Sequence, residues 1–277
     1  MKLRLRSGLP PLARACLAAL LCVLAAAPAA AVQFRLAATH TLEDSGLLKV
    51  LIPAFEANSG VKVRLSIGGT GQVVKLAANG DVDAVLSHVK TEEEKLVSTG
   101  AGLRRYVVAY NDFFLVGPAQ DPARIRGMRD AVEAMRKIYE AKARFVSRGD
   151  ESGTHLKEKF LWHSAGIVPK WDGYVSAGLG MGRVLLMAGE FRAYTLADRA
   201  TFAVFRARTG LEKLLAGDSR LYNEYGVVTV NPAKFPGINF DAAGQFVSWL
   251  TSARAQQLIA GFRVAGEQVF FIPAKAN

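Results

Sequence analysis

Three short turns in this chain could bind an oxyanion, because each lies between a predicted strand and a predicted helix. The turns are rich in glycine and hydroxyl side chains and lie at residues 39–41, 69–71 and 148–154. A helix N-terminus carries unsatisfied N–H donors and about half a positive charge from its aligned peptide dipoles. Such termini bind tetrahedral oxyanions. Three turns of this kind predict an oxyanion-binding protein.

Side chains in the turns could add donors to those of the backbone. The guanidinium of Arg148 is a planar fork that can give two charge-assisted hydrogen bonds to adjacent oxygens. Its alternative role is an ion pair with Asp150 or Glu151, and Ser152 could simply cap its own helix. His40 could donate to an anion, more strongly once protonated, or could face solvent. The candidate ligand-binding residues are Thr39, His40, Thr41, Gly69, Thr70, Gly71, Arg148, Ser152, Gly153 and Thr154.

Other chemistries have weaker support in the sequence. His155 and His163 would lie two helical turns apart, too far to share one metal without other ligands, so no metal site is predicted. A hydrolase could use Ser152 with His155 and either Asp150 or Asp198. No Gly-x-Ser-x-Gly elbow is present, however, and a serine that caps a helix is committed to backbone donors. No catalytic residue and no cofactor are predicted.

The N-terminus predicts export. Residues 1–31 combine four basic side chains, an apolar run over residues 15–27 and a final run of small residues, as in a secretory signal peptide. The apolar run is shorter than the roughly 20 residues that span a membrane. Cys16 and Cys22 both lie in this segment, and neither follows a convincing lipoprotein signal. The mature protein is therefore expected to be periplasmic, without an anchor, a disulfide or a thiol.

The charge is basic but scattered. The formal charge of +11 falls to +7 when residues 1–31, with four basic and no acidic side chains, are removed. No block of five or six Lys or Arg residues occurs, and no repeat mixes aromatic with basic residues. A nucleic-acid partner is therefore not expected. The favoured explanation of the excess positive charge is that it keeps the protein soluble.

Strand and helix patterns alternate along the chain, which predicts an α/β fold with mostly parallel strands. Apolar residues alternate with polar ones over 61–67, as in a strand with one buried face, and helical spacing precedes them, ending near Gly60. Strands at 113–116 and 227–230 are the candidate crossings between two domains. The expected organisation is a first lobe of residues 32–112 and 228–277, a second lobe of residues 113–227, and a ligand cleft between them.

The order and spacing of many short motifs resemble the periplasmic substrate-binding proteins of tungstate ABC transporters, the TupA-like family. The matching residues, which cover nearly all of the chain after residue 31, include Asp44-Ser45-Gly46, Gly69-Thr70-Gly71-Gln72, Tyr110-Asn111-Asp112-Phe113, Ser147-Arg148-Gly149-Asp150, Ser152-Gly153-Thr154-His155, Gly180-Met181-Gly182, Tyr194-Thr195-Leu196 and Asp198-Arg199. The resemblance implies a type II periplasmic-binding-protein fold, in which two α/β lobes close on the ligand. It also implies delivery of tungstate or molybdate to an ABC permease by a monomer, and it favours the ligand role of Arg148.

One departure from the family lies in the first turn. The family has a run of threonines followed by serine and threonine there, whereas this chain has Ala38-Thr39-His40-Thr41-Leu42. The ligand could therefore be tungstate, molybdate or another oxyanion such as sulfate or phosphate. A phosphate site would need a carboxylate to accept the phosphate proton. A sensory role for the same binding lobe stays open.

Overall fold

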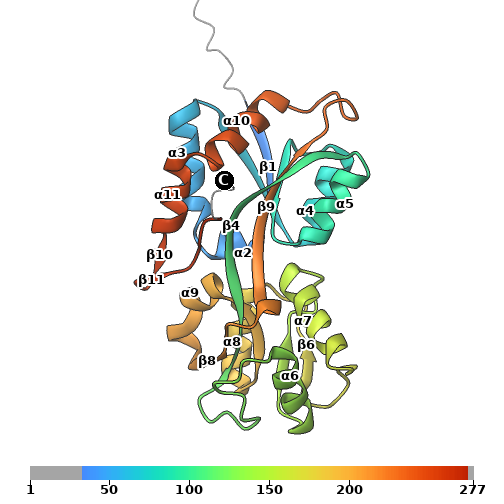
Figure 1. The fold of residues 1–277 in the computed structure, drawn as a ribbon, viewed down its shortest axis with the longest axis vertical. Coiled ribbons are helices and arrows are strands. Elements are labelled where there is room, and N and C mark those ends of the chain that lie inside the picture. Colours follow the sequence, from blue (N-terminus) through green and yellow to red (C-terminus); the bar gives the residue numbers. More distant parts are fainter. Residues whose placement is uncertain (1–32, 274–277) are drawn as a thin grey trace, which may run out of the picture. The chain divides into compact units, whose positions relative to one another are not determined.

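Strands and helices alternate along residues 33–273, which are the residues that the computed structural model describes. The predicted signal peptide lies outside them. Up to the first crossing, the elements are β1 (Gln33–Thr39), α2 (His40–Asp44), α3 (Leu48–Ser59), β2 (Lys62–Gly68), α4 (Thr70–Asn79), β3 (Ala84–Ser87), α5 (Lys90–Ser98) and β4 (Gly102–Pro118). Figure 1 shows that β4 passes from one half of the described structure into the other.

The second half of the chain first completes the other lobe and then returns. Its elements are α6 (Ala131–Glu140), β5 (Phe145–Ser147), α7 (Gly153–Ser164), β6 (Tyr174–Ser176), α8 (Met181–Phe191), β7 (Thr195–Asp198), α9 (Arg199–Thr209), β8 (Leu211–Leu215), a 3₁₀ turn at Ser219–Leu221, β9 (Tyr222–Val230), α10 (Phe240–Leu250), α11 (Ala253–Gly261), β10 (Arg263–Val264) and β11 (Glu267–Gln268). β9 carries the chain back beside β4.

The main sheet has the strand order β2-β1-β3-β9-β4-β7, with β8 also paired to β4. β2, β1 and β3 are parallel, whereas β9 runs antiparallel to both β3 and β4. Parallel strands require helical crossovers, and α2 to α4 supply them here. The α/β class that the sequence predicts is therefore correct. The prediction of mostly parallel strands is wrong, because β4 pairs antiparallel with β7, β8 and β9, and β3 pairs antiparallel with β9.

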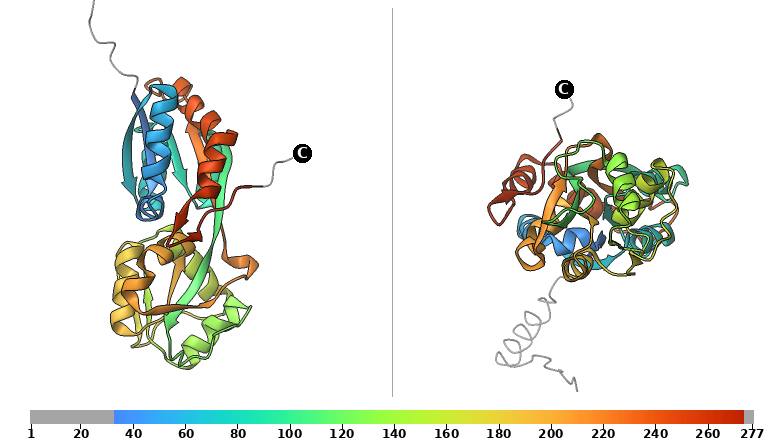
Figure 2. Two further views of the ribbon diagram at one scale, coloured as in Figure 1. Left: turned by 90° about the vertical axis from the view of Figure 1, so that its left-hand side faces the viewer. Right: turned by 90° about the horizontal axis from the view of Figure 1, so that it is seen from below.

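In what we call the first lobe, the sheet is covered on both faces. Leu36 and Leu86 pack in one cluster with residues of α3, α10 and α11, while Ala37 and Val85 pack in another with residues of α4 and α5. Neighbouring residues of one strand point to opposite faces, so the segments that serve both cores, such as 36–38 of β1 and 84–86 of β3, are apolar on both faces. Helices lie on both sides of this sheet in Figures 1 and 2.

In the second lobe, β4 and β7 repeat this arrangement. Phe113 and Leu196 pack with residues of α6 and α7, while Phe114 and Ala197 pack with residues of α8 and α9. Short parallel strands β5 and β6 extend the lobe. Each cluster of buried apolar residues takes almost all its members from a single lobe. The lobe boundaries at 112–113 and 227–228 stay a prediction.

Element boundaries differ from the sequence prediction mainly after β1. The predicted turn at residues 39–41 is itself partly helical, because the short helix α2 begins already at His40, and the longer helix α3 begins at Leu48. The hydroxyl of Ser45 explains the break, because it donates to Leu42 O and accepts from Leu47 N–H. Among residues 33–273, no helix is both long and apolar enough to cross a membrane.

Candidate functional site

Two of the three predicted turns are adjacent because their strands are parallel neighbours. In the pairing of β1 with β2, Thr39 lies opposite Gly68, so the turns that follow leave the same edge of the sheet. Thr39 is the N-cap residue of α2 and Gly69 that of α4, and neither helix has a side-chain cap. The first N–H groups of α2 and α4 are therefore not taken up by a capping side chain.

The third turn reaches the second one across the lobes. Gly153 N–H, in the first turn of α7, donates to Thr70 Oγ1 at 3.2 Å. A Cβ placed on Gly69 would lie 4.0 Å from Asp150 O. The three predicted turns therefore meet, with residues 39–41 and 69–71 contributed by the first lobe and residues 148–154 by the second.

Buried polar atoms without a hydrogen-bond partner occur in the first and third turns. Arg148 is 1% exposed; its Nη2 donates to Asp150 Oδ2 at 2.5 Å, but its Nε and Nη1 have no partner among the described residues. The same is true of Thr39 Oγ1 and Thr154 Oγ1. Because buried polar groups are nearly always paired, these unpaired donors mark a place for a ligand with several acceptor oxygens.

The backbone of the third turn suits close packing around Arg148. Gly149 has φ of 62°, and a Cβ there would lie 2.0 Å from Ser176 Oγ. A larger residue would displace the Ser176 hydroxyl and would strain the backbone at this positive φ, so both observations favour glycine. Ser152 Oγ accepts from His155 N–H at 3.4 Å and caps α7. Ser152 therefore has the capping role that the sequence analysis offered as its alternative.

Besides Asp150, the carboxylates of Asp44 and Asp198 lie near the Arg148 guanidinium. Burial raises the pKa of Asp44, whereas the charges of His40 and Arg148 lower it. Asp198 is fully buried, and this burial raises its pKa to about 6 even though Thr201 N–H donates to Oδ2 at 2.9 Å. The site therefore contains acceptor groups as well as donors, which the sequence pattern of the three turns did not indicate.

The three side chains of the first turn differ in their burial and in their hydrogen-bond partners. Thr39 Oγ1 is buried and unpaired, whereas Thr41 Oγ1 lies 2.9 Å from His88 Nε2. His40 is about half-exposed and its Nδ1 lies 3.8 Å from Glu43 Oε2. His40 also lines a cavity of about 470 Å³ that is formed with Asp44, Gly180, Gly182, Arg183 and Phe205. His40 therefore shares a cavity with Asp44 and is more exposed than Thr39 and Thr41.

A fourth helix N-terminus borders this cavity and was not predicted as part of the site. Gly180 is the N-cap residue of α8 and has no side-chain cap. The strand-turn-helix layout around it is the same signal that identified the other turns. Gly182 N–H lies near the Asp44 carboxylate and lowers its pKa. The first and second lobes therefore also meet at α2 and α8.

The alternative chemistries find little support in this geometry. The ring Nδ1 of His155 accepts from Glu151 N–H at 3.0 Å, while Ser152 Oγ accepts from the His155 backbone. No hydrogen bond joins the Ser152 hydroxyl to the His155 ring, as a serine hydrolase would need. Within residues 33–273, no group of three or more His, Cys, Asp or Glu side chains is arranged to hold a metal ion.

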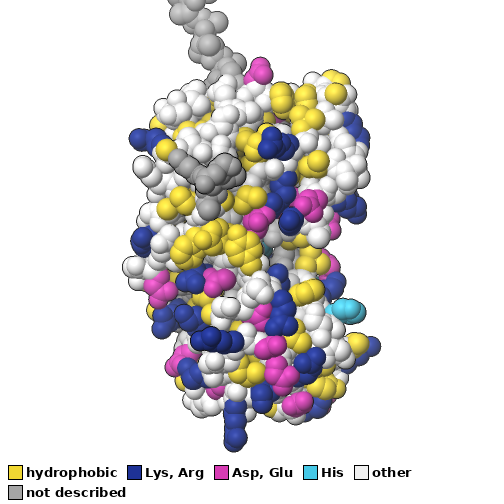
Figure 3. Space-filling view, in the orientation of Figure 1, with side chains coloured by type: hydrophobic (Ala, Val, Ile, Leu, Met, Phe, Trp, Pro, Cys, Tyr) yellow, Lys and Arg dark blue, Asp and Glu magenta, His cyan; other side chains and the backbone are white. Residues whose placement is uncertain are grey.

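The surface shows mixed charge. On the face drawn in Figure 3, Lys and Arg side chains are interspersed with Asp and Glu side chains over both halves. Several basic residues are engaged in ion pairs, such as Arg126 with Glu212 and Arg199 with Asp112. The predicted site differs from this surface because its positive charge comes from the buried side chain of Arg148.

Comparisons with known proteins agree with this geometry. Residues 25–254 match the PBP superfamily domain. The chain is 47% identical over 226 residues to the tungstate-binding protein TupA of Peptoclostridium acidaminophilum, an alignment that covers 81% of this chain and 79% of the relative. Two solved structures are similar. The tungstate ABC transporter protein of Geobacter sulfurreducens has a TM-score of 0.76 and 46% identity, covering 83% of this chain and 98% of its own. The tungstate-binding protein TupA of Desulfovibrio alaskensis G20 has a TM-score of 0.78 and 38% identity, covering 88% of this chain and 100% of its own. The chain therefore belongs to the PBP superfamily and, within it, to the family of the tungstate-binding protein TupA.

Proposed function

We propose that this protein captures a tetrahedral oxyanion, tungstate or molybdate, in the cleft between its lobes. The observation that carries the proposal is the buried guanidinium of Arg148, whose Nε and Nη1 lack partners while its Nη2 is held by Asp150. Unpaired hydroxyls of Thr39 and Thr154 belong to the first and third turns, and Arg148 belongs to the third. A tetrahedral anion with four acceptor oxygens requires several such donors together.

Tungstate and molybdate suit this site because they carry no proton at neutral pH and only accept hydrogen bonds. Relatives that are 47% and 38% identical to this chain are named tungstate-binding proteins. The candidate ligand-binding residues Thr39, Gly69, Thr70, Gly71, Arg148, Gly153 and Thr154 contribute side-chain or backbone donors, or permit a close approach of the backbone. His40, Thr41 and Ser152 act from the edge of the site or through other groups.

The protein then serves as the extracytoplasmic solute-binding component of an ABC importer and not as an enzyme. One relative is named a tungstate-binding protein and another a tungstate ABC transporter, which supports this role and a location outside the cytoplasmic membrane. A single lobe pair contains all three turns, so a monomer is sufficient to bind the ligand. A permease would receive the anion when the lobes open.

The first experiment is thermal unfolding of the purified protein with tungstate, molybdate, sulfate or phosphate, each titrated at constant ionic strength. A ligand at 100 times its Kd stabilises the native state by about 2.7 kcal/mol, which gives a clear rise in Tm. We expect tungstate and molybdate to raise the Tm and sulfate to have little effect. Arg148→Ala should remove the response.

Each other outcome has a distinct meaning. A shift with phosphate alone would identify a site in which Asp198 or Asp44 accepts the phosphate proton, and would contradict the tungstate assignment. No shift with any of the four anions would contradict oxyanion binding altogether. A shift in a protein that fails to stimulate its permease would favour the sensory alternative.

A further inference from the structure

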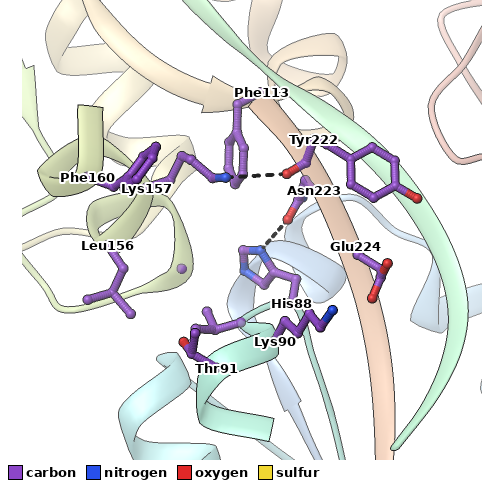
Figure 4. Close-up of a pocket in the computed structure, with 12 residues that line it drawn as sticks. His88, Lys90, Thr91, Phe113, Leu156, Lys157, Phe160, Tyr222, Asn223 and Glu224 are labelled. Atoms are coloured by element: carbon purple, nitrogen blue, oxygen red, sulfur yellow. Dashed lines mark hydrogen bonds between the residues drawn. The ribbon is translucent and has the colours of Figure 1, made fainter. Parts of the chain in front are cut away.

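His88 joins the first predicted turn, residues 39–41, to the strands that cross between the lobes. We call the three predicted turns the anion turns. Its Nε2 lies 2.9 Å from Thr41 Oγ1, and its Nδ1 lies 2.9 Å from Asn223 Oδ1 in β9. Figure 4 shows the contact with Asn223. The ring is stacked on Tyr225, with centroids 5.3 Å apart. The imidazole is therefore held at both nitrogens and on one face.

Which atom donates in each of these hydrogen bonds follows from the contacts of Asn111, the residue that hydrogen-bonds to Asn223. Asn111 Nδ2 donates to Val269 O at 3.4 Å, and a carbonyl oxygen can only accept. Asn111 Oδ1 therefore faces Asn223 and accepts from Asn223 Nδ2 at 2.7 Å. Asn223 Nδ2 also donates to Tyr225 Oη at 3.1 Å. The amide of Asn223 must then present its oxygen to His88.

This direction fixes the tautomer of His88. Asn223 Oδ1 is an acceptor, so the hydrogen of that contact must be on His88 Nδ1. Burial lowers the pKa of His88 to about 4, and the nearby charges of Arg148 and Lys157 act in the same direction. At neutral pH the ring therefore has one hydrogen and Nε2 is an acceptor. The hydroxyl of Thr41 must be the donor in the contact with Nε2.

We propose that His88 is a positioning residue for anion binding, which takes the hydroxyl hydrogen of Thr41 and so withholds it from the ligand. The first turn then binds the anion through its main-chain N–H groups and the hydroxyl of Thr39. This consequence for binding rests on the proposed oxyanion function. The tautomer itself does not, because it follows from contacts within the protein.

His88 also lies where the second lobe closes on the first. A Cβ on Gly153 would lie 2.6 Å from His88 Cε1, so the first turn of α7 packs directly on the imidazole edge. His88 therefore touches the first anion turn, the third anion turn and β9. Movement of the ring would disturb all three, which is why its fixed orientation matters for closure.

The tautomer can be measured directly by long-range ¹H–¹⁵N NMR of uniformly ¹⁵N-labelled protein at pH 7. The signal of His88 is identified as the one that His88→Gln removes. We expect Nδ1 to be protonated and Nε2 to be unprotonated, the less common tautomer for a free imidazole. A hydrogen on Nε2 would overturn the proposal, whether or not the protein binds an oxyanion.

A double-mutant cycle on Kd for tungstate tests the consequence for binding. Thr41→Val should cost little affinity in the wild type, because the hydroxyl hydrogen is already used by His88. In a His88→Leu background that hydrogen is free to turn to the anion, so the same substitution should cost at least about threefold more, as residues of one hydrogen-bond network are coupled. Equal costs in both backgrounds would overturn the proposal. If His88→Leu does not fold, the NMR measurement on wild type decides. If tungstate does not bind at all, the proposed function fails while the tautomer is still tested.

Discussion

Gly153 N–H donates to Thr70 Oγ1 at 3.2 Å, and this hydrogen bond joins α7 of the second lobe to α4 of the first. Both residues are buried, with Thr70 1% exposed. The contact forms only while the lobes are together, so the structure has the closed arrangement in which the anion turns meet. Substitutions at this junction can therefore separate closure from folding.

Gly153→Ala should weaken oxyanion binding without destabilising the ligand-free protein. The added Cβ would lie 2.6 Å from His88 Cε1 and 2.8 Å from Val89 Cγ2, and His88 is held by its hydrogen bonds. The clash exists only when α7 approaches the first lobe. We expect a loss of at least about tenfold in Kd, about 1.4 kcal/mol, by isothermal titration calorimetry.

Gly244→Ala provides the matched control for that substitution. Gly244 lies inside α10, and a Cβ there would meet no atom within 4 Å. Alanine is favoured over glycine in a helix interior by about 1 kcal/mol, so this variant should be more stable and bind as tightly as the wild type. A Gly153→Ala variant with unchanged Kd would show that the close approach to His88 is not needed for binding.

Arg148→Ala should reduce the affinity for tungstate by at least about 100-fold, because charge-assisted hydrogen bonds are worth about 1.5–3 kcal/mol each and two donors would be lost. Arg148→Lys retains the charge but not the planar fork, so its affinity for tungstate should lie between those of the wild type and Arg148→Ala. Arg64→Ala removes the same charge from an exposed position of β2 and serves as the control. Comparable losses in Arg148→Ala and Arg64→Ala would assign the effect to net charge alone.

Thr154→Val should have opposite effects on binding and on stability. The side chain is 1% exposed and its hydroxyl has no partner among the described residues, so valine removes an unsatisfied polar group of similar shape. The Tm of the ligand-free protein should stay the same or rise, while Kd for tungstate should increase by at least about tenfold. A fall in Tm with unchanged Kd would make Thr154 a structural residue.

Glu158→Gln should change how stability depends on pH. Burial raises the pKa of Glu158 to about 7, although Trp162 Nε1 and Tyr174 Oη donate to its Oε1. Between about pH 4.5 and 7 the folded state therefore binds the extra proton, and the free energy of unfolding falls as the pH rises. The contribution is at most about 1.4 kcal/mol per pH unit for one proton.

Chemical unfolding of wild type and Glu158→Gln at pH 5 and pH 7 measures this effect. Glutamine can accept the same hydrogen bonds without titrating, so the variant should lose less stability than the wild type between the two values. The free energy of unfolding of Glu158→Gln should therefore rise relative to that of the wild type as the pH rises from 5 to 7. Parallel pH dependences would show that Glu158 does not take up a proton on folding.

The fold was predictable because its signals are local. Period-two apolar patterns located β2, and the left-handed Gly60, with φ of 73°, ends α3 as the sequence indicated. α2 was missed because five residues give no periodic pattern, and its end depends on hydrogen bonds of Ser45 that only the folded chain reveals. Lobe boundaries carry no sequence signal, since β4 and β9 pass through the crossing as unbroken strands.

The site was predictable to the extent that it depends on turns before helices. That pattern includes the turns of Arg148, Thr39 and Thr154, whose ligand role stays a prediction, and Gly180 has the same pattern. His88 and Asp198 also lie between a strand and a helix, but their roles come from partners that are distant in the sequence, 135 residues apart in the case of His88 and Asn223. Which side chains approach one another across the lobes depends on the tertiary structure.

The crossing between the lobes is a paired ribbon, since Tyr110, Asn111 and Asp112 of β4 lie opposite Glu224, Asn223 and Tyr222 of β9. Two separate tethers would let the lobes slide past each other. A ribbon can bend and twist, but sliding by one residue would break its ladder and turn every side chain to the wrong face. The two halves of the binding site therefore keep the same alignment along the strands each time the protein opens and closes. After an anion is released, the lobes can close again without first finding the correct strand register.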